Sequence, residues 1–382
     1  MADTRWIGNA AAVADVYTVQ ITAYHASTTY KVTINGKTVS VIGAGTVNDT
    51  ATALQVALAA STIPEFQEVT WTVSTDTVTG TGATAGLPVT VTATVSGGTG
   101  TLSLSHVTTA TGPNFADNAA NWSGGSVPAD SDVVYVDDSE VPILYGLDLS
   151  SIQPAAVHIR KTFTASEGIG LPKVNPNGYQ EYRETYWKIG PTTLIIDAEE
   201  AGTIRINTGT DQTAIEIRSG TVEWIGTHAS NTAETQAGDF SAAKYGGEAA
   251  TLATYRHVGG TAVLSTGVSL TTMVVGEGTL EFASAVTTYT QYGAATVTFR
   301  GSAAMGTGTQ YAGILYFNSS GGVGTSFTAA GGRLDCSQDL SPKTFAALAL
   351  NGGDWYDPLH VVTVTALTRG ASVDGLGPFT SA

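Results

Sequence analysis

Apolar and polar positions alternate along the second half of the chain in a pattern that returns about every 18 residues. Each member reads glycine, any residue, apolar, any residue, apolar, with alanine in place of glycine in one member and mostly polar residues at the unrestricted positions. The members begin at Gly202, Gly220, Gly260, Gly278, Ala295, Gly313 and Gly332. The steps between them are 18, 40, 18, 17, 18 and 19 residues. The step of 40 fits either two coils or one coil with a polar insertion. Such a period predicts stacked, repeating units.

Alternate side chains of a strand point to opposite faces, so each member predicts a short strand with two apolar residues inside and its polar residues outside. Stacked strands would then form a parallel β-solenoid with ladders of like residues. The predicted interior ladder consists of Ile206, Trp224, Leu264, Phe282, Phe299, Phe317 and Cys336. The predicted outer column consists of Thr203, Thr221, Thr261, Thr279 and Thr296. A second apolar column is expected at Val268, Val286, Met305 and Val323.

We therefore expect an all-β protein with a minor α content, whose solenoid covers residues 133–345. The hexapeptide pattern of left-handed β-helices is absent from the sequence, which favours a right-handed or irregular solenoid. Residues 346–382 depart from the repeat, and we expect them to cap the open edge of the last coil.

Residues 14–112 have a different pattern and predict a small β-rich module with one helix. The segment Tyr30–Val41 alternates on both sides of Asn35-Gly36, which is a strong hairpin signal because both central residues must adopt positive φ. The segment Asn48–Ser61 opens with capping residues, carries Leu54 and Leu58 one turn apart, and stops before a proline, so it predicts the helix.

Two segments connect these parts. Residues 1–13 predict an N-terminal arm without a partner strand of its own, which either lies on a neighbouring subunit or is a frayed terminus. The Gly/Asn/Pro-rich residues 113–132 predict a linker between the domains. Aromatic residues and arginine are enriched at protein interfaces. The candidate interface residues are Arg5, Trp6, Ile7, Tyr179, Tyr182, Arg183, Tyr186 and Trp187. Packing of Tyr179–Trp187 on its own solenoid is the equal alternative.

Some segments have a familiar order. Asn121–Val136, NWSGGSVPADSDVVYV, resembles the entry motif of β-helical passenger and adhesin-like proteins. The succession of Arg5–Gly8, the Asn35-Gly36 hairpin, the helix and the β-rich module resembles virion proteins of tailed bacteriophages and prophages. Val141–Ser150 and Ile169–Gly190 are similar to the same group. The resemblance implies a structural protein of a phage particle, and it includes no catalytic motif.

The composition and net charge of the chain argue against several classes of partner and site. The chain of 382 residues has a formal charge of −16, which repels phosphate backbones, so we expect no nucleic acid partner. No run of about 18 apolar residues occurs, so we expect no membrane-spanning helix. The single cysteine, Cys336, excludes an internal disulfide framework and a cysteine-rich zinc site.

Candidate chemistry is sparse. Solenoid enzymes can cleave polysaccharides with paired carboxylates. The acidic candidates here are Asp197, Glu199, Glu200, Asp335 and Asp354. The residues that could hold a calcium ion are Asp130, Asp132, Asp137, Asp138 and Glu140. Acidic turn residues on a solvated surface explain both groups better, and the six histidines are scattered. We expect no catalytic or metal site, no cofactor and no enzymatic activity.

The expected function is that of a capsid decoration subunit. The module would attach to the major capsid protein or to other virion proteins, and the solenoid would project from the outer surface of a particle assembled in the host cytoplasm. Projecting solenoids of phage particles are commonly homotrimers, which the resemblance extends to this chain. The alternative is a tail fibre or tailspike that recognises, or also cleaves, a cell-surface glycan. A secreted adhesin is a third hypothesis, which rests on the NWSGG motif alone.

Overall fold

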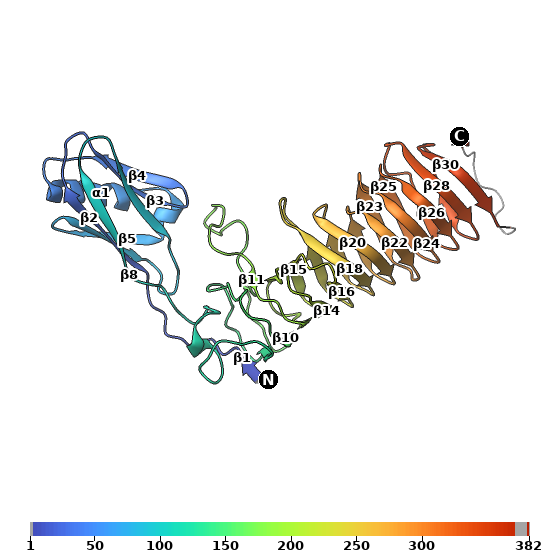
Figure 1. Cartoon of the computed structure of the whole chain (residues 1–382), viewed down its shortest axis with the longest axis horizontal. Coiled ribbons are helices and arrows are strands. Elements are labelled where there is room, and N and C mark those ends of the chain that lie inside the picture. Colours follow the sequence, from blue (N-terminus) through green and yellow to red (C-terminus); the bar gives the residue numbers. More distant parts are fainter. Residues whose placement is uncertain (1–2, 371–379, 382) are drawn as a thin grey trace.

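The computed structural model describes residues 3–370 and 380–381. It shows a nearly all-β chain in which a compact N-terminal module and a long parallel β-solenoid are set at an angle to each other (Figure 1). The expected fold class is therefore confirmed. Among the described residues, no helix has the length and apolar character needed to cross a bilayer.

The module contains two antiparallel sheets, in the orders β5-β6-β2-β8 and β4-β3-β7. Its strands are β2 (Val16–Ala23), β3 (Thr29–Ile34), β4 (Lys37–Ile42), β5 (Val69–Ser74), β6 (Thr77–Gly82), β7 (Val91–Ser96) and β8 (Thr101–Thr108). Two helices, α1 (Val47–Ala59) and α2 (Pro64–Gln67), join them. The core of the module includes Val19, Tyr30, Leu54 and Trp71.

Local sequence explains these elements. Asn35 and Gly36 have φ angles of 50° and 71°, so they form the predicted hairpin between β3 and β4. Thr46 caps α1, because its hydroxyl accepts a hydrogen bond from the Asp49 amide at 3.1 Å. The expectation of a single helix was wrong, since Pro64 begins the short helix α2 at a position where its missing N–H costs nothing.

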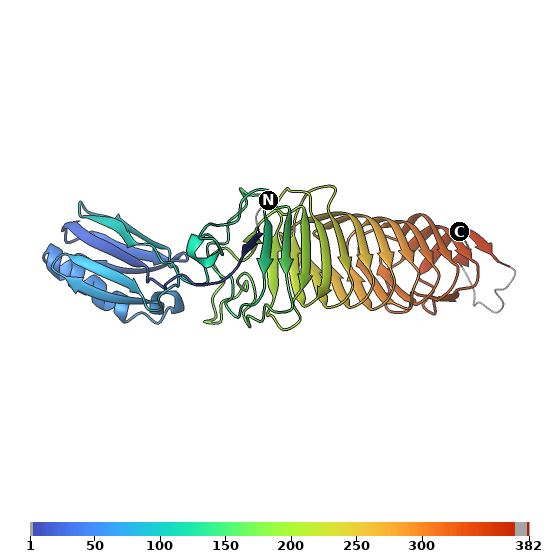
Figure 2. The same cartoon turned by 90° about the horizontal axis from the view of Figure 1, so that it is seen from below.

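The solenoid is built from two parallel sheets, to which most coils contribute one strand each. The larger sheet, called sheet A here, lies with its strands side by side along the solenoid (Figure 2). It comprises β1 (Asp3–Arg5), β9 (Val133–Val136), β10 (Ala156–Ile159), β12 (Thr193–Asp197), β14 (Ala214–Ser219), β16 (Thr232–Thr235), β18 (Ala250–His257), β20 (Val268–Val275), β22 (Val286–Gln291), β24 (Met305–Gln310), β26 (Val323–Ala329), β28 (Lys343–Leu350), β30 (Val362–Arg369) and β31 (Thr380–Ser381).

The second sheet, called sheet B here, carries the glycine-led repeat. It comprises β11 (Trp187–Lys188), β13 (Ile204–Asn207), β15 (Thr221–Ile225), β17 (Asp239–Ala242), β19 (Thr261–Leu264), β21 (Thr279–Phe282), β23 (Thr296–Gly301), β25 (Ile314–Ser319), β27 (Arg333–Asp335) and β29 (Asp354–Tyr356). The step of 40 residues holds two coils, because β17 lies between β15 and β19. Phe240 pairs there with Val222 on one side and Ala262 on the other.

The seven side chains of the predicted interior ladder are all buried. Phe282 and Phe299 stack with ring centroids 4.4 Å apart, and Phe317 meets Phe299 edge-on at 5.1 Å. The outer column is in register as well, with Thr279 paired to Thr261 and Thr296.

The second apolar column on sheet A needs one correction. Val286, Met305 and Val323 pair in succession, but Val286 lies opposite Leu270 rather than opposite Val268. Strand β20 carries apolar residues at both positions, so spacing alone did not distinguish them. Both side chains are buried.

The N-terminal segment belongs to the solenoid. Strand β1 pairs in parallel with β9, so the chain begins in the first coil, leaves it to form the module, and returns. The expectation of an arm without a partner strand was therefore wrong. Asp15 connects the two ends of the inserted module. Its carboxylate accepts hydrogen bonds from His106, the Val89 amide and the Ala110 amide.

The predicted linker is packed rather than free. Asn121 is buried and its amide donates to the carbonyl groups of Gly112 and Phe115. Trp122 packs edge-on against Trp6, with ring centroids 5.1 Å apart. These residues cover the N-terminal end of the solenoid interior, which a repeat structure requires at its open end.

The predicted C-terminal cap was also placed incorrectly. Strands β28 and β30 pair in parallel from Lys343 and Val362 to Leu350 and Arg369, and β29 extends sheet B. The repeat therefore continues through the first part of residues 346–382. Residues 371–379 and 382 lie outside the described part of the chain.

A few polar side chains lie inside the solenoid at the ends of sheet A strands. Gln291 donates to the Ala295 carbonyl at 2.7 Å, and Gln310 donates to the Gly313 carbonyl at 3.2 Å. They satisfy turn carbonyls that would otherwise be buried without partners. His257 occupies the corresponding position of an earlier coil, and its Nδ1 lies 3.2 Å from the Tyr255 hydroxyl.

Burial lowers the pKa of His257 to about 4, against 6.5 for a free side chain. The imidazole is neutral in both states above pH 6.5, and below it the unfolded chain takes up the proton first. We therefore predict that acidification from pH 7 to pH 4 removes about 3 kcal/mol of unfolding free energy through this residue. Chemical denaturation of the wild type and of His257→Gln measures it, because glutamine already serves this column.

The expected result is a smaller loss of stability in His257→Gln than in the wild type over this pH range. His360→Gln, at an exposed site, is the control and should follow the wild type. Identical pH dependences for all three proteins would contradict the prediction.

Candidate functional site

The module and the solenoid meet in a buried ionic cluster around Arg183. Its guanidinium donates to the Glu68 carboxylate at 2.6 Å and to the Pro88 carbonyl at 2.7 Å, both in the module. The guanidinium also donates to Glu181 at 3.1 Å, and Glu181 lies two residues earlier in the same loop after Leu171. Arg183, Glu68 and Glu181 are all almost fully buried, so each charge depends on its partners.

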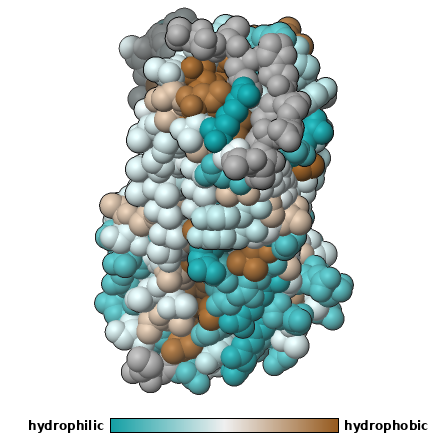
Figure 3. All heavy atoms as spheres, turned by 90° about the vertical axis from the view of Figure 1, so that its right-hand side faces the viewer, coloured by the Kyte–Doolittle hydropathy of each residue, from teal (hydrophilic) through white to brown (hydrophobic). Residues whose placement is uncertain are grey.

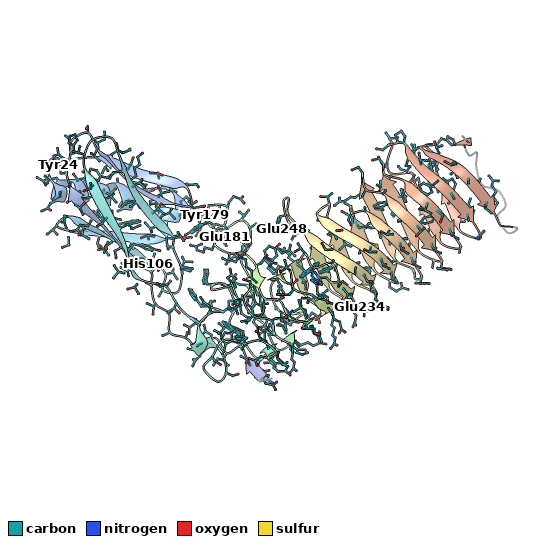
Figure 4. All side chains as sticks on the ribbon, in the orientation of Figure 1. Tyr24, His106, Tyr179, Glu181, Glu234 and Glu248 are labelled. Carbon is teal, nitrogen blue, oxygen red and sulfur yellow. The ribbon has the colours of Figure 1, made fainter. Side chains whose placement is uncertain are left out.

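The same loop supplies further bonds to the module. The Tyr179 hydroxyl donates to Glu68, and the Asn35 amide donates to the Gln180 carbonyl at 3.1 Å. Figure 4 shows Tyr179 and Glu181 on this loop beside the module. Burial, reinforced by the bond to Glu68, raises the pKa of Tyr179 above its ordinary range, so the hydroxyl keeps its proton. The cluster fixes the position of the module relative to the first coils.

The candidate interface residues of this region are therefore used inside the chain. Tyr179, Tyr186 and Trp187 are buried, and Tyr182 packs against the core of the module. Trp187 lies in the solenoid interior, stacked on Trp122 with ring centroids 6.4 Å apart. The prediction that this segment faces another subunit was wrong, and packing on its own chain is the correct alternative.

The N-terminal candidates have similar roles. Trp6 is buried, and its indole N–H donates to the Val141 carbonyl at 2.9 Å. Arg5 forms an ion pair with the buried Asp137. Of the three, Ile7 alone leaves an apolar side chain exposed, so this segment does not form a docking arm.

A hollow of about 520 Å³ opens beside the junction. Glu68 and Leu87 line it from the module, and Tyr145, Leu171 and Pro172 line it from the solenoid. Burial raises the pKa of Tyr145 to about 12, so its hydroxyl is a donor at neutral pH. Glu68 and Glu181 on its wall already accept the bonds described above.

The acidic candidates are not brought together. Asp197 accepts a hydrogen bond from Ser219 at 2.7 Å, whereas Glu199 and Glu200 are exposed. Asp335 is buried against Arg333 and accepts from Ser337. Asp354 pairs across the strands with Arg333 and not with Asp335.

The possible calcium ligands have other partners. Asp137 binds Arg5 and Arg160, and Asp130 accepts from the Gln153 amide at 2.7 Å. Asp132 accepts from the Ala129 amide at 3.1 Å. Asp138 and Glu140 are exposed. Within the described residues, no three His, Cys, Asp or Glu side chains converge as metal ligands would.

A second ionic cluster lies on the outer face of sheet B and was not predicted from the sequence. Glu223 accepts from Arg205 at 3.0 Å and from Lys244 at 2.6 Å. Lys173 and Glu248 form an ion pair nearby. Arg205 and Glu223 occupy the same outward position of successive coils, so the repeat register contained the signal for the first of these pairs.

A comparison with protein-family models gives no match to this chain, and a comparison with curated proteins gives none either. The function must therefore be argued from the geometry above.

Proposed function

We propose that this chain is a non-enzymatic structural protein of a tailed-phage particle. It decorates the outer surface of the capsid, attaches to the major capsid protein or another virion protein through its module, and projects the solenoid outward. The observation that carries the proposal is the buried junction around Arg183. Because the module is inserted after strand β1 and is held by Arg183, force on the solenoid is transmitted to the attached module.

The module has apolar groups suited to attachment. Ile42 and Val56 are 64% and 58% exposed, and they belong to β4 and α1, which contact each other. Viewed from the C-terminal end, hydrophobic residues are scattered among large areas of intermediate hydropathy (Figure 3).

The proposal includes a homotrimer that forms through the outer face of sheet A instead of the Tyr179–Trp187 segment. On the outer face of sheet A, Thr288 pairs with Thr307 and Thr290 pairs with Thr309. Tyr292 and Tyr311 follow on the same face, 60% and 51% exposed, with parallel rings 5.2 Å apart. A flat, uncharged surface with exposed aromatics costs little to desolvate and suits packing around an axis.

Attachment and assembly can be tested with the full-length chain. Added to particles that lack it, the chain should bind, and Ile42→Asp should weaken binding at least tenfold. Leu340→Asp, 75% exposed on the solenoid, should bind normally. Equal binding by both variants, or the absence of binding by the wild type, would refute attachment through the module.

The mass in solution should correspond to three copies of the 39.1 kDa chain. Thr307→Lys should dissociate the trimer, because it places like charges on the packed face, whereas Thr279→Lys on sheet B should not. A wild-type monomer both in solution and on the particle would refute the trimer.

The alternative function is a tail fibre or tailspike that recognises a cell-surface glycan. One observation favours it, namely a hollow on the first coils of the solenoid that is lined by Arg5, Arg160, Lys161 and Arg218. The location of the bound chain on the particles distinguishes the two functions. A decoration subunit binds to the heads, whereas a fibre binds to the tails.

A further inference from the structure

A hollow of about 870 Å³ opens on the outer face of sheet A, over its first strands. The register of β1, β9 and β10 places Arg5, Tyr135 and His158 side by side. Strand β12 adds Ile195, which also lines the hollow. Cationic side chains surround these positions: Arg5, Arg160, Lys161 and Arg218.

This concentration of positive charge is unusual for the chain. The chain has 16 lysines and arginines against 32 acids, and four of those 16 line this hollow. Arg5 and Arg160 share one buried carboxylate, that of Asp137, so this group of three carries an excess positive charge. Lys161 is 70% exposed and lies 3.9 Å from Asp197, too far for a hydrogen bond.

The two arginines are held in place. Each uses its NH1 group for Asp137, and each guanidinium lies over the Tyr135 ring, at 4.6 Å for Arg5 and 4.3 Å for Arg160. A cation fixed in this way loses little conformational freedom when a ligand binds. The other guanidinium N–H groups of both arginines have no hydrogen-bond partner among the described residues.

The arginines act on His158, and Arg218 is itself paired with Glu216 at 2.8 Å. Burial lowers the pKa of His158, and the charges of Arg160 and Arg218 lower it further. Other groups around the hollow are acceptors: the carboxylates of Asp138 and Asp197 and the hydroxyl of Thr162. Donors and acceptors therefore face one space that is far larger than a single inorganic ion.

We propose that this hollow binds an acidic sugar, a saccharide unit that carries a carboxylate or a phosphate group. The anionic group lies against Arg160, Lys161 and Arg218, and the hydroxyls bond to Asp197 and Thr162. The ring packs against Ile195 and His158. A hollow of this size with few apolar groups fits a small polyhydroxylated anion. Long polyanions are repelled by the net charge of −16.

Calorimetric titration of the full-length chain at low salt tests the proposal. The probes are glucuronate, glucose 6-phosphate, glucose and inorganic phosphate. Lys161→Gln and Arg218→Gln should each weaken binding of the acidic sugars about tenfold, the effect of losing one charged hydrogen bond. The control is Arg300→Gln, which removes an exposed arginine from a distant coil and should bind as the wild type does.

Binding of either acidic sugar, with weak or no binding of glucose and of inorganic phosphate, supports the proposal. The response to the two acids tells whether the recognised group is carboxylate or phosphate. Equal affinity for glucose 6-phosphate and inorganic phosphate overturns the sugar site. Binding that is absent, or that Lys161→Gln and Arg300→Gln change equally, overturns the cationic site. These outcomes are independent of attachment to a particle, so either proposal can fail alone.

Discussion

Phe299→Ala should lower the unfolding free energy by about 3–5 kcal/mol. Phe299 is fully buried between the rings of Phe282 and Phe317 on neighbouring coils. Alanine would leave a cavity that the rigid backbone ladders on both sides cannot close, and it would remove both ring contacts. Denaturant unfolding, followed by circular dichroism and intrinsic fluorescence, measures the change.

The matched control is Thr298→Ala in the same strand. Thr298 points outward between Glu281 and Tyr316, so its replacement should change stability by about 0.5 kcal/mol or less. Similar effects for Phe299→Ala and Thr298→Ala would contradict the assignment of inward and outward positions in β23.

The parts of the fold that sequence predicted have local causes. A strand with period-two alternation and a glycine before it defines its own inside and outside, so the ladder around Phe299 could be identified without knowing its neighbours. The Asn35-Gly36 hairpin is local in the same way, because its two positive φ angles depend on residues that are adjacent in sequence.

The parts that sequence did not predict depend on distant pairing. Nothing in the three residues of β1 indicates that they pair with β9, because the whole module separates the two strands. The same separation concealed the cationic hollow, in which Arg5 meets Asp137 and Arg160. Candidate sites built across an insertion are visible only once the register is known.

Two predictions, the interface segment and the C-terminal cap, were wrong because they relied on residue types and on the repeat pattern. The aromatic segment around Tyr179 and Trp187 has the residue types of an interface, but those types also suit a buried junction between domains of one chain. The C-terminal end was expected to form a cap because residues 346–382 depart from the glycine-led repeat. Backbone pairing continues there regardless, since a parallel ladder depends on main-chain groups rather than on side chains.

The glycine that opens most strands of sheet B is the most demanding position of the repeat. The φ angles of Gly238, Gly260, Gly313 and Gly332 lie between 70° and 79°, and that of Gly278 is 86°. A Cβ atom added to Gly278 would lie 2.3 Å from the carbonyl oxygen of Gly260 in the preceding coil. Ala295 occupies the same position in one coil, and there φ is not positive. Side chains are therefore excluded wherever the left-handed turn is used.

Gly278→Ala should destabilise the solenoid by about 2–4 kcal/mol. The left-handed conformation costs an alanine about 1–2 kcal/mol, and relief of the contact with the Gly260 backbone requires the coils to separate locally. The control is Gly246→Ala, because a Cβ there meets nothing within 4 Å and φ is not positive. It should change the unfolding free energy by about 0.5 kcal/mol or less.

Because each coil contacts only its neighbours, the damage should also be local. Hydrogen exchange of Gly278→Ala should rise first in β19, β21 and β23, whereas the module should exchange as in the wild type. Uniformly faster exchange along the solenoid, or a stability equal to that of Gly246→Ala, would show that the coils do not depend on close glycine packing. The close approach of Gly278 to the Gly260 backbone then could not be what sets the spacing of the repeat.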